Sequence, residues 1–271
     1  MIKIIVDAAS DCSKEEGYQI IPIAINIDGT EYLELEKDAF YQLQATAKDF
    51  PKTAQPAPQT FVDLFEKAKT EGDEIIYFAI SSALSGTYQC ANLAKAMVDY
   101  DKIYIIDSKL ASHLIGMLAH YAEKLMGDGF SAAEIVEKCE DLKGKVKVLA
   151  GLDTLEYLYK GGRLSRASAA VGEIANIKPI ITISPEGKVE PIGKCIGKMR
   201  SMQFITDKLE GFEVDEQFPI YSLYTYGTEN CEQLEKKLAD QGYSIADRLQ
   251  VGPTIGAHVG PGVYAVLFVT K

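Results

Sequence analysis

The sequence contains no tryptophan, only three histidines and only five cysteines among its 271 residues. The cysteines are scattered along the chain, their number is odd, and no two of them form a CxxC pair. This pattern argues against a disulfide framework and against a zinc site, and it favours thiols that stay reduced. We therefore expect no metal site and no structural disulfides.

Basic residues are also scarce, since 28 lysines and arginines stand against 39 acidic residues and the net charge is −11. A protein of this charge is a poor partner for nucleic acid, because phosphate binding needs a basic surface. No apolar run approaches the length of a membrane span, and no segment of signal-peptide type precedes the first predicted strand. We expect a cytoplasmic protein without a membrane span.

The first half of the chain alternates apolar strand patterns with amphipathic helix patterns. Apolar residues recur at helical spacing over Thr60–Thr70, which predicts a helix that ends at Gly72. The stretch "SAAE" at Ser131–Glu134 predicts a capping box at the start of another helix. Strands that alternate with helices indicate a parallel sheet with helices on its faces, so we expect an α/β domain over residues 1–150. Its strands are predicted at Ile2–Val6, Ile20–Ile27, Ile75–Ile80 and Ile103–Asp107.

The second half has a different pattern. A strand is predicted at Val148–Gly151, followed by a helical pattern over residues 154–177. Two further strands, Pro179–Ser184 and Lys188–Gly193, are joined by "PEGK", which is typical of a hairpin turn. Antiparallel strands beside helices indicate a smaller α+β domain over residues 151–271. The fold class is therefore α/β, with an N-terminal parallel-sheet domain and a smaller C-terminal α+β domain.

The stretch "FAISSALSGTYQCA", Phe78–Ala91, has five hydroxyl side chains and no charge after a predicted strand. Loops at the carboxyl ends of parallel strands bind ligands, and hydroxyls beside a helix N-terminus favour an anion. Ser85 could instead be only a helix cap. It could also be a hydrolase nucleophile, with a base from His113, His120 or His258, although "ALSGT" lacks the glycine two residues earlier that a nucleophile elbow needs.

Three other stretches also have an unusual composition. In "KTAQPAP" two prolines restrain the backbone around Thr53 and Gln55, which either presents these side chains or only leads into a helix. In "KGGRLSR" the guanidinium of Arg163 either lies at the surface or pairs with a carboxylate or phosphate. In "GPTIGAHVGPG" glycines surround His258, which either occupies a turn or donates to a carboxylate.

In this order, "VDAASD", "TAQP", "SSALSGTY", "KGGR" and "AHVGPG" resemble the motifs of the DegV family of bacterial fatty acid-binding proteins over essentially the whole chain. The resemblance implies that a long-chain fatty acid lies in an apolar tunnel between the two domains. It also implies that Thr53 and Ser85 bind the carboxylate, with His258 and Arg163 in a polar network behind them. No metal or nucleotide cofactor is then needed. We expect three further residues to support the same site: Ser82, Gly86 and Thr87.

The resemblance also implies a protein partner, an ATP-dependent fatty acid kinase that converts the bound carboxylate to an acyl-phosphate for phospholipid synthesis. Arg200 is expected on the surface that meets this kinase, although the basic run that is common there is reduced to Lys198 and Arg200. Two hypotheses result. The protein is a non-catalytic fatty acid carrier, or it is a serine acyl-hydrolase that uses Ser85 and His258.

Overall fold

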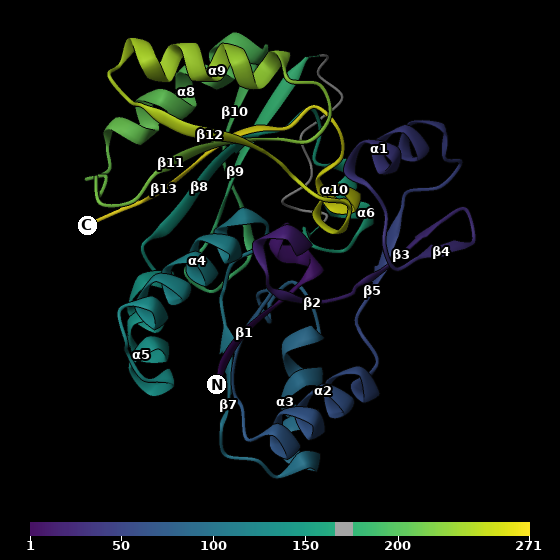
Figure 1. Ribbon diagram of the computed structural model, residues 1–271. Helices are drawn as coiled ribbons and strands as arrows, with labels where there is room; N and C mark the ends of the chain where they lie inside the picture. The colour runs from purple at the N-terminus through teal and green to yellow at the C-terminus, as the bar shows by residue number, and fades with distance from the viewer. Residues whose placement is uncertain (166–175) are drawn as a thin grey trace. The chain divides into compact units, whose positions relative to one another are not determined.

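The computed structural model describes residues 1–165 and 176–271, which form two compact units (Figure 1). Each unit combines several segments of the chain. Unit 1 comprises Met1–Ala24, Thr53–Gly144 and Pro185–Gly187. Unit 2 comprises Ile25–Lys52, Lys145–Ser184 and Lys188–Lys271.

A four-stranded parallel sheet is the centre of unit 1, as the alternation of strand and helix patterns predicted. The strand order is β2-β1-β6-β7, and each neighbouring pair is parallel. These strands have the apolar composition of a sheet that is buried on both faces. Their bounds are β1 (Ile2–Asp7), β2 (Gln19–Ile21), β6 (Glu74–Ala79) and β7 (Ile103–Asp107).

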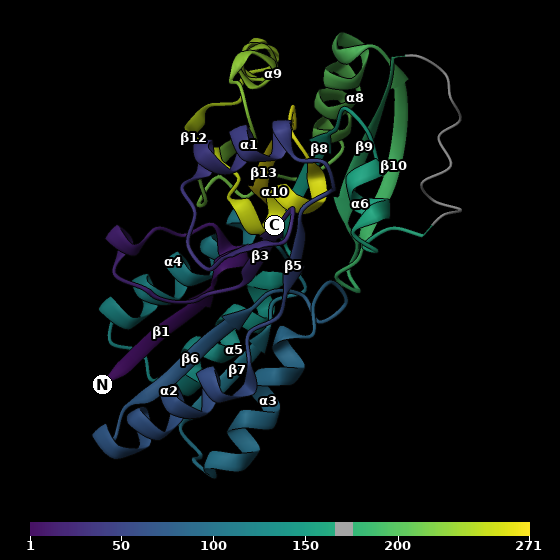
Figure 2. The same cartoon turned by 90° about the vertical axis from the view of Figure 1, so that its right-hand side faces the viewer.

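Two pairs of helices cover the two faces of this sheet (Figures 1 and 2). On one face, α2 (Pro58–Glu71) and α3 (Thr87–Val98) bury a core that includes Phe61 and Tyr77. The other face is covered by α4 (His113–Gly127) and α5 (Ala132–Lys143). Two short 3₁₀ turns follow β1, namely η1 (Ala8–Ser10) and η2 (Lys14–Glu16).

The predicted helix ends of unit 1 are confirmed. The hydroxyl of Ser131 accepts from the N–H of Glu134, and the Glu134 carboxylate accepts from the Ser131 N–H, so both halves of the capping box form. Gly72 ends α2 with a φ of +72°, a left-handed conformation that favours glycine.

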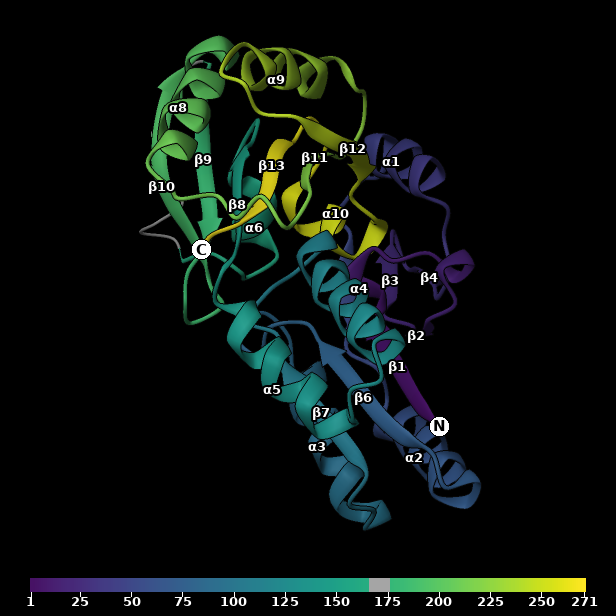
Figure 3. The ribbon, with the colours of Figure 1, turned by 60° about the vertical axis from the view of Figure 1, so that its left-hand side comes forward.

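A mixed six-stranded sheet, of order β10-β9-β8-β13-β11-β12, is the centre of unit 2. The predicted hairpin is confirmed, since β9 and β10 pair antiparallel. Figure 3 shows α8 (Lys198–Glu210) and α9 (Glu229–Asp240) over one face of the sheet, where α8 contacts β8, β9 and β10 and α9 contacts β11, β12 and β13. The strands are β8 (Val146–Gly151), β9 (Ile177–Ile183), β10 (Val189–Ile196), β11 (Ile220–Tyr224), β12 (Ile245–Gln250) and β13 (Tyr264–Val269).

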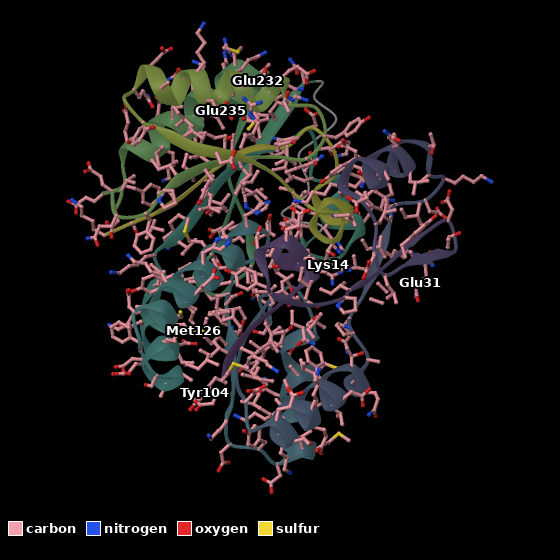
Figure 4. The ribbon with its side chains drawn as sticks, in the orientation of Figure 1. Lys14, Glu31, Tyr104, Met126, Glu232 and Glu235 are labelled. Atoms are coloured by element: carbon pink, nitrogen blue, oxygen red, sulfur yellow. The ribbon has the colours of Figure 1, made fainter. Side chains whose placement is uncertain are left out.

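An ion-pair cluster joins α9 to β12. Glu232 and Glu235 of α9, labelled in Figure 4, lie 2.8 Å and 2.6 Å from the two terminal guanidinium nitrogens of Arg248. The hydroxyl of Ser222 also donates to Glu235 at 2.5 Å. These bonds hold the outer strand of the sheet against its helix.

The helix predicted over residues 154–177 is only partly present. Helix α6 spans Glu156–Lys160, whereas Ile177 begins strand β9. The prediction was wrong at Ile177 because this residue starts an apolar, β-branched run that pairs along β10. It was also wrong at residues 161–165, which form turns after α6, while residues 166–175 lie outside the described residues.

Unit 2 also includes a strand and two helices that the sequence did not predict, and the predicted strand Ile20–Ile27 is divided into β2 and a second strand, Ala24–Ile27, that pairs in a hairpin. Tyr41 of α1 donates to the carbonyl of Val251 at 2.8 Å, and this bond holds α1 near the start of α10. Within the described ranges, no helix is long and apolar enough to cross a membrane. The bounds are β3 (Ala24–Ile27), β4 (Thr30–Tyr32), α1 (Lys37–Thr46) and α10 (Pro253–Val259), with β5 (Lys52–Ala54) as the third strand beside β3.

Candidate functional site

The first two hydroxyls after β6 hold the loop itself. The buried Ser81 donates to the carbonyl of Gly187 at 2.8 Å. Ser82 donates to Asp107 at 2.5 Å and accepts from Lys109 at 3.0 Å. The pKa of Asp107 is lowered, because its bonds to Lys109 and Ser82 outweigh the effect of its burial. This part of the stretch therefore fixes the loop to the neighbouring strand.

The next hydroxyls lie where helix α3 begins. The side-chain oxygens of Ser85 and Thr87 are 2.8 Å apart and hydrogen-bonded, and Ser85 also accepts from the Thr87 N–H at 3.3 Å. Gly86 is the N-cap residue and has no side chain to satisfy the first turn. The first N–H groups of a helix have no partner within the helix, and together with the helix dipole they attract anions. Ser85 and Thr87 thus flank a helix end that favours negative charge.

The "TAQP" stretch lies beside the start of α3. A Cβ atom at Gly86 would come within 1.9 Å of Gln55 Oε1, so the glutamine amide lies directly over this glycine. The thiol of Cys90, one turn into α3, donates to the carbonyl of Pro56 at 3.3 Å. Thr53 is half-buried in the short strand β5, two residues before Gln55. Unit 1 therefore brings the second and third motifs of the sequence together.

A buried carboxylate lies at the end of β1 in the same unit. Asp7 is fully buried and accepts from the N–H groups of Ala9 and Ile80 and from the hydroxyl of Tyr77. Burial raises its pKa to about 6, although these three bonds partly oppose the shift. Asp7 holds the ends of two adjacent strands in register, and the sequence analysis did not identify this role.

In unit 2, His258 lies in a short helix and not in the turn that was one alternative for it. Pro253 occupies the first turn of α10, where a missing N–H costs nothing, and Gly260 ends the helix. The imidazole is only 9% exposed. Burial, together with a smaller effect of the positive charge of Arg163, lowers the pKa of His258 to about 4. His258 is therefore neutral at pH 7.

Arg163 and His258 come together around one glycine. The guanidinium of Arg163 donates to the carbonyl of Gly161 at 2.6 Å. A Cβ atom at Gly161 would come within 2.3 Å of His258 Nδ1, so only glycine leaves room for the imidazole. The "KGGR" and "AHVGPG" motifs thus form one contact within unit 2.

A second glycine-to-ring contact joins the same two segments, but here the glycine follows His258 and the ring precedes Gly161. A Cβ atom at Gly260 would come within 2.5 Å of the Tyr157 ring, and Gly260 has a φ of +75°. The Tyr157 ring also packs edge-on against Phe50, with ring centroids 4.8 Å apart. The aromatic packing around Tyr157 holds the chain that follows His258.

Arg200 is exposed in the first turn of α8. Its neighbour Lys198 lies 3.6 Å from Asp153, and Lys178 lies 2.8 Å from the same carboxylate oxygen. Arg200 has no such ion pair with the residues that the structure describes.

The predicted residues therefore form two groups. Unit 1 holds Ser85, Gly86 and Thr87 at the start of α3 and Thr53 in β5, whereas the Ser82 hydroxyl is engaged by Asp107 and Lys109. Unit 2 holds Arg163 and His258 around Gly161. Three or more potential metal ligands do not gather anywhere in the described ranges. The double glycine of "KGGR" was the signal for the Gly161 contact, whereas only Arg163 was considered as a site residue in this stretch.

Comparisons with known proteins agree on one family. A family model described as "Uncharacterised protein, DegV family" matches residues 1–271. A DegV domain-containing protein of Caldanaerobacter subterraneus subsp. tengcongensis is 33% identical over 279 residues, which cover 100% of this chain and 99% of that protein. A DegV domain-containing protein of Clostridium perfringens is 32% identical over 282 residues, or 98% and 96% of the two chains.

Solved structures are similar over the full length. A fatty acid binding DegV family protein from Streptococcus agalactiae has a TM-score of 0.90 at 26% identity, with 100% of this chain and 99% of that chain covered. A DegV family protein from Thermus thermophilus, described by its fatty acid binding, has a TM-score of 0.87 at 28% identity and the same coverage. A stearic acid-binding protein from Eubacterium ventriosum, also with the same coverage, has a TM-score of 0.87 at 25% identity.

Proposed function

The chain belongs to the DegV family, and from this premise we propose that it binds one long-chain fatty acid and presents the carboxylate to a separate ATP-dependent fatty acid kinase. The observation that carries the proposal is the similarity, over the whole chain, to solved DegV proteins that bind fatty acids. In this proposal the protein is a carrier without catalytic activity of its own, and it needs no metal or nucleotide cofactor.

The hydroxyls at the start of α3 support the head-group part of the proposal. A carboxylate cannot be buried without partners, because losing its water costs several kcal/mol. Ser85, Thr87 and Thr53 supply neutral donors near a helix end that favours anions. Each hydrogen bond to a charged group contributes roughly 1.5–3 kcal/mol. This set would therefore fix the orientation of a fatty acid without adding charge.

His258 and Arg163 are proposed to complete the polar set. The imidazole is neutral at pH 7, so it can donate one hydrogen bond and accept another. Arg163 supplies a positive charge beside it, and the bond from its guanidinium to the Gly161 carbonyl limits its freedom to move. A neutral donor backed by a fixed cation suits an anion that must later react with a phosphoryl group.

The acyl chain would supply most of the binding free energy. Burial of each methylene contributes roughly 0.8 kcal/mol, so a sixteen-carbon chain gains on the order of 10 kcal/mol before the ordering cost is subtracted. The head group would then decide orientation, and the tail would decide affinity.

The exposed Arg200 supports the kinase part of the proposal. It lies in the first turn of α8, where a partner protein can reach its guanidinium. A planar guanidinium suits recognition of carboxylate or phosphate groups on a partner.

Mass spectrometry of lipid extracted from the purified protein tests the proposal. We expect one long-chain fatty acid per monomer, and uptake of fatty acid when the delipidated protein is titrated. Absence of bound fatty acid together with absence of uptake would refute the carrier function. Turnover of an activated acyl ester that is lost in Ser85→Ala would instead favour the serine acyl-hydrolase.

A further inference from the structure

The side chain of Gln55 occupies a defined position at the start of α3. Its amide lies over Gly86, the residue between Ser85 and Thr87. A Cβ atom at position 86 would come within 1.9 Å of Oε1 and 3.1 Å of Cδ, but only within 3.7 Å of Nε2. The amide nitrogen is therefore the part of the side chain that points away from the glycine.

The backbone around Gln55 is restrained, although the side chain is exposed. Pro56 follows directly, and its carbonyl accepts from the Cys90 thiol of α3. Pro58 begins α2 two residues later. Fixed φ angles at both prolines limit the conformations of this segment. Gln55 is thus held over the helix end by its backbone and not by bonds of its own side chain.

The Gln55 amide makes no hydrogen bond to any residue in the ranges that the structure describes, although it has two donor hydrogens and an acceptor oxygen. The side chain is exposed, and its amide lies over a glycine, beside two hydroxyls that bond to each other.

We propose that Gln55 is a third head-group residue in unit 1, whose amide donates to the bound carboxylate beside Ser85. This inference rests on the proposed fatty acid binding and adds a specific ligand contact to it. An amide is a neutral donor, so it can donate a hydrogen bond to an anion without forming the ion pair that a lysine would form. A Cβ atom at position 86 would displace the amide from this place.

Three substitutions at Gln55 and a control test this contact by fatty acid titration. Gln55→Met keeps the length of the side chain and removes both polar atoms, so the Kd should rise about tenfold, the equivalent of one hydrogen bond to a charged group. Gln55→Glu has nearly the shape of glutamine but places a second negative charge beside the carboxylate, so it should weaken binding more than Gln55→Met does. Gln55→Ala should resemble Gln55→Met.

The matched control is Gln89→Glu, which introduces the same charge on the exposed face of α3 one turn from Gly86. It should bind fatty acid with an affinity close to that of the unmodified protein. Thermal unfolding of every variant checks that the fold is retained, and all of them should stay within a few degrees of the parent.

Gly86→Ala tests the same contact from the other side. Gly86 has a φ of −75°, which alanine adopts without strain, so the new methyl group should act only by displacing the amide. Gly86→Ala should therefore weaken binding about as much as Gln55→Met, and the double variant should lose little more.

Binding by Gln55→Glu that equals that of the parent, or that is no weaker than that of Gln55→Met, would overturn the inference while fatty acid binding by the parent stands. Failure of the unmodified protein to bind any fatty acid would overturn the proposed function itself. The two failures are therefore distinguishable in one set of titrations.

Discussion

The imidazole of His258 lies against the backbone of Gly161, so closely that a Cβ atom at position 161 would come within 2.3 Å of Nδ1. The reverse contact occurs between the Tyr157 ring and Gly260. Each segment thus supplies a ring and a glycine to the other. Because both glycines are required, the "KGGR" and "AHVGPG" motifs act as one structural element.

Gly161→Ala should therefore lower the free energy of unfolding by about 1–3 kcal/mol, the usual cost of overpacking a filled site. Gly161 has a φ of −74°, so the cost would come from contact with the imidazole and not from backbone strain. Urea denaturation measures the effect. Gly127→Ala in α4 is the control, since a Cβ atom there meets nothing within 4 Å. Equal stability of the two variants would contradict the contact.

The low pKa of His258 makes stability depend on pH in a known direction. The pKa is about 4 in the folded protein and about 6.5 in the unfolded chain, so the unfolded chain binds more protons between these values. The contribution of His258 is complete above pH 6.5 and is lost as the pH falls towards 4, by on the order of 3 kcal/mol. Relative to the parent, His258→Gln should therefore gain stability as the pH falls through this window. Urea denaturation at pH 7.5 and pH 4.5 gives the comparison.

Asp7 should act in the opposite direction. Its pKa is about 6 in the folded protein and 3.8 as the reference value, so the folded state binds more protons between these values. The stability that this provides is complete below pH 3.8 and is lost as the pH rises through 6. Asp7→Asn removes the ionisable group, and the NH₂ of the new amide faces at least one of the three donors that Asp7 accepts from. It should destabilise the protein strongly at pH 4.5 and by about 2 kcal/mol less at pH 8. If the difference in the free energy of unfolding between Asp7→Asn and the parent did not change with pH, the raised pKa of Asp7 would be contradicted.

The sequence predicted the elements of unit 1 well because each is fixed by local patterns. Apolar runs predicted β1, β6 and β7, and the "SAAE" box predicted the start of α5. The short helix α10 was not predicted, because its proline, its single glycine and the glycines at both of its ends are typical of a turn. Packing of its Gly256 against Phe40 and Tyr41 of α1 supports it instead, and such a contact has no local signal.

The sequence suggested a set of site residues but not the contacts that these residues make. Five hydroxyls after β6 suggested one polar cluster, whereas Ser81 and Ser82 bond to other loops and only Ser85 and Thr87 pair at the helix start. The partners of Ser81 and Ser82 are 25 or more residues away along the chain. Spacing in a sequence cannot reveal contacts at that separation.

The double substitution Ser85→Ala with Thr53→Val should weaken fatty acid binding without unfolding the protein. Loss of two hydrogen bonds to a charged group corresponds to roughly 3 kcal/mol or more, about a hundredfold in Kd. Neither side chain is fully buried, so core packing should be retained. Titration with a fatty acid and thermal unfolding of the same sample give both quantities. Unchanged affinity with a lowered melting temperature would show that Ser85 is only a helix cap.

Arg200→Ala should separate partner recognition from lipid binding. The side chain is exposed on α8, so its loss should leave the affinity for fatty acid intact and reduce phosphorylation by the cognate kinase at least tenfold. Lys236→Ala, which removes an exposed cation from α9, is the control and should change neither quantity. His258→Ala should impair both processes, and phosphorylation more than binding, because the imidazole is proposed to contact the head group itself. Parallel measurements of lipid affinity and acyl-phosphate formation distinguish these cases. If Arg200→Ala weakened lipid binding and spared phosphorylation, the roles proposed for Arg200 and His258 would have to be exchanged.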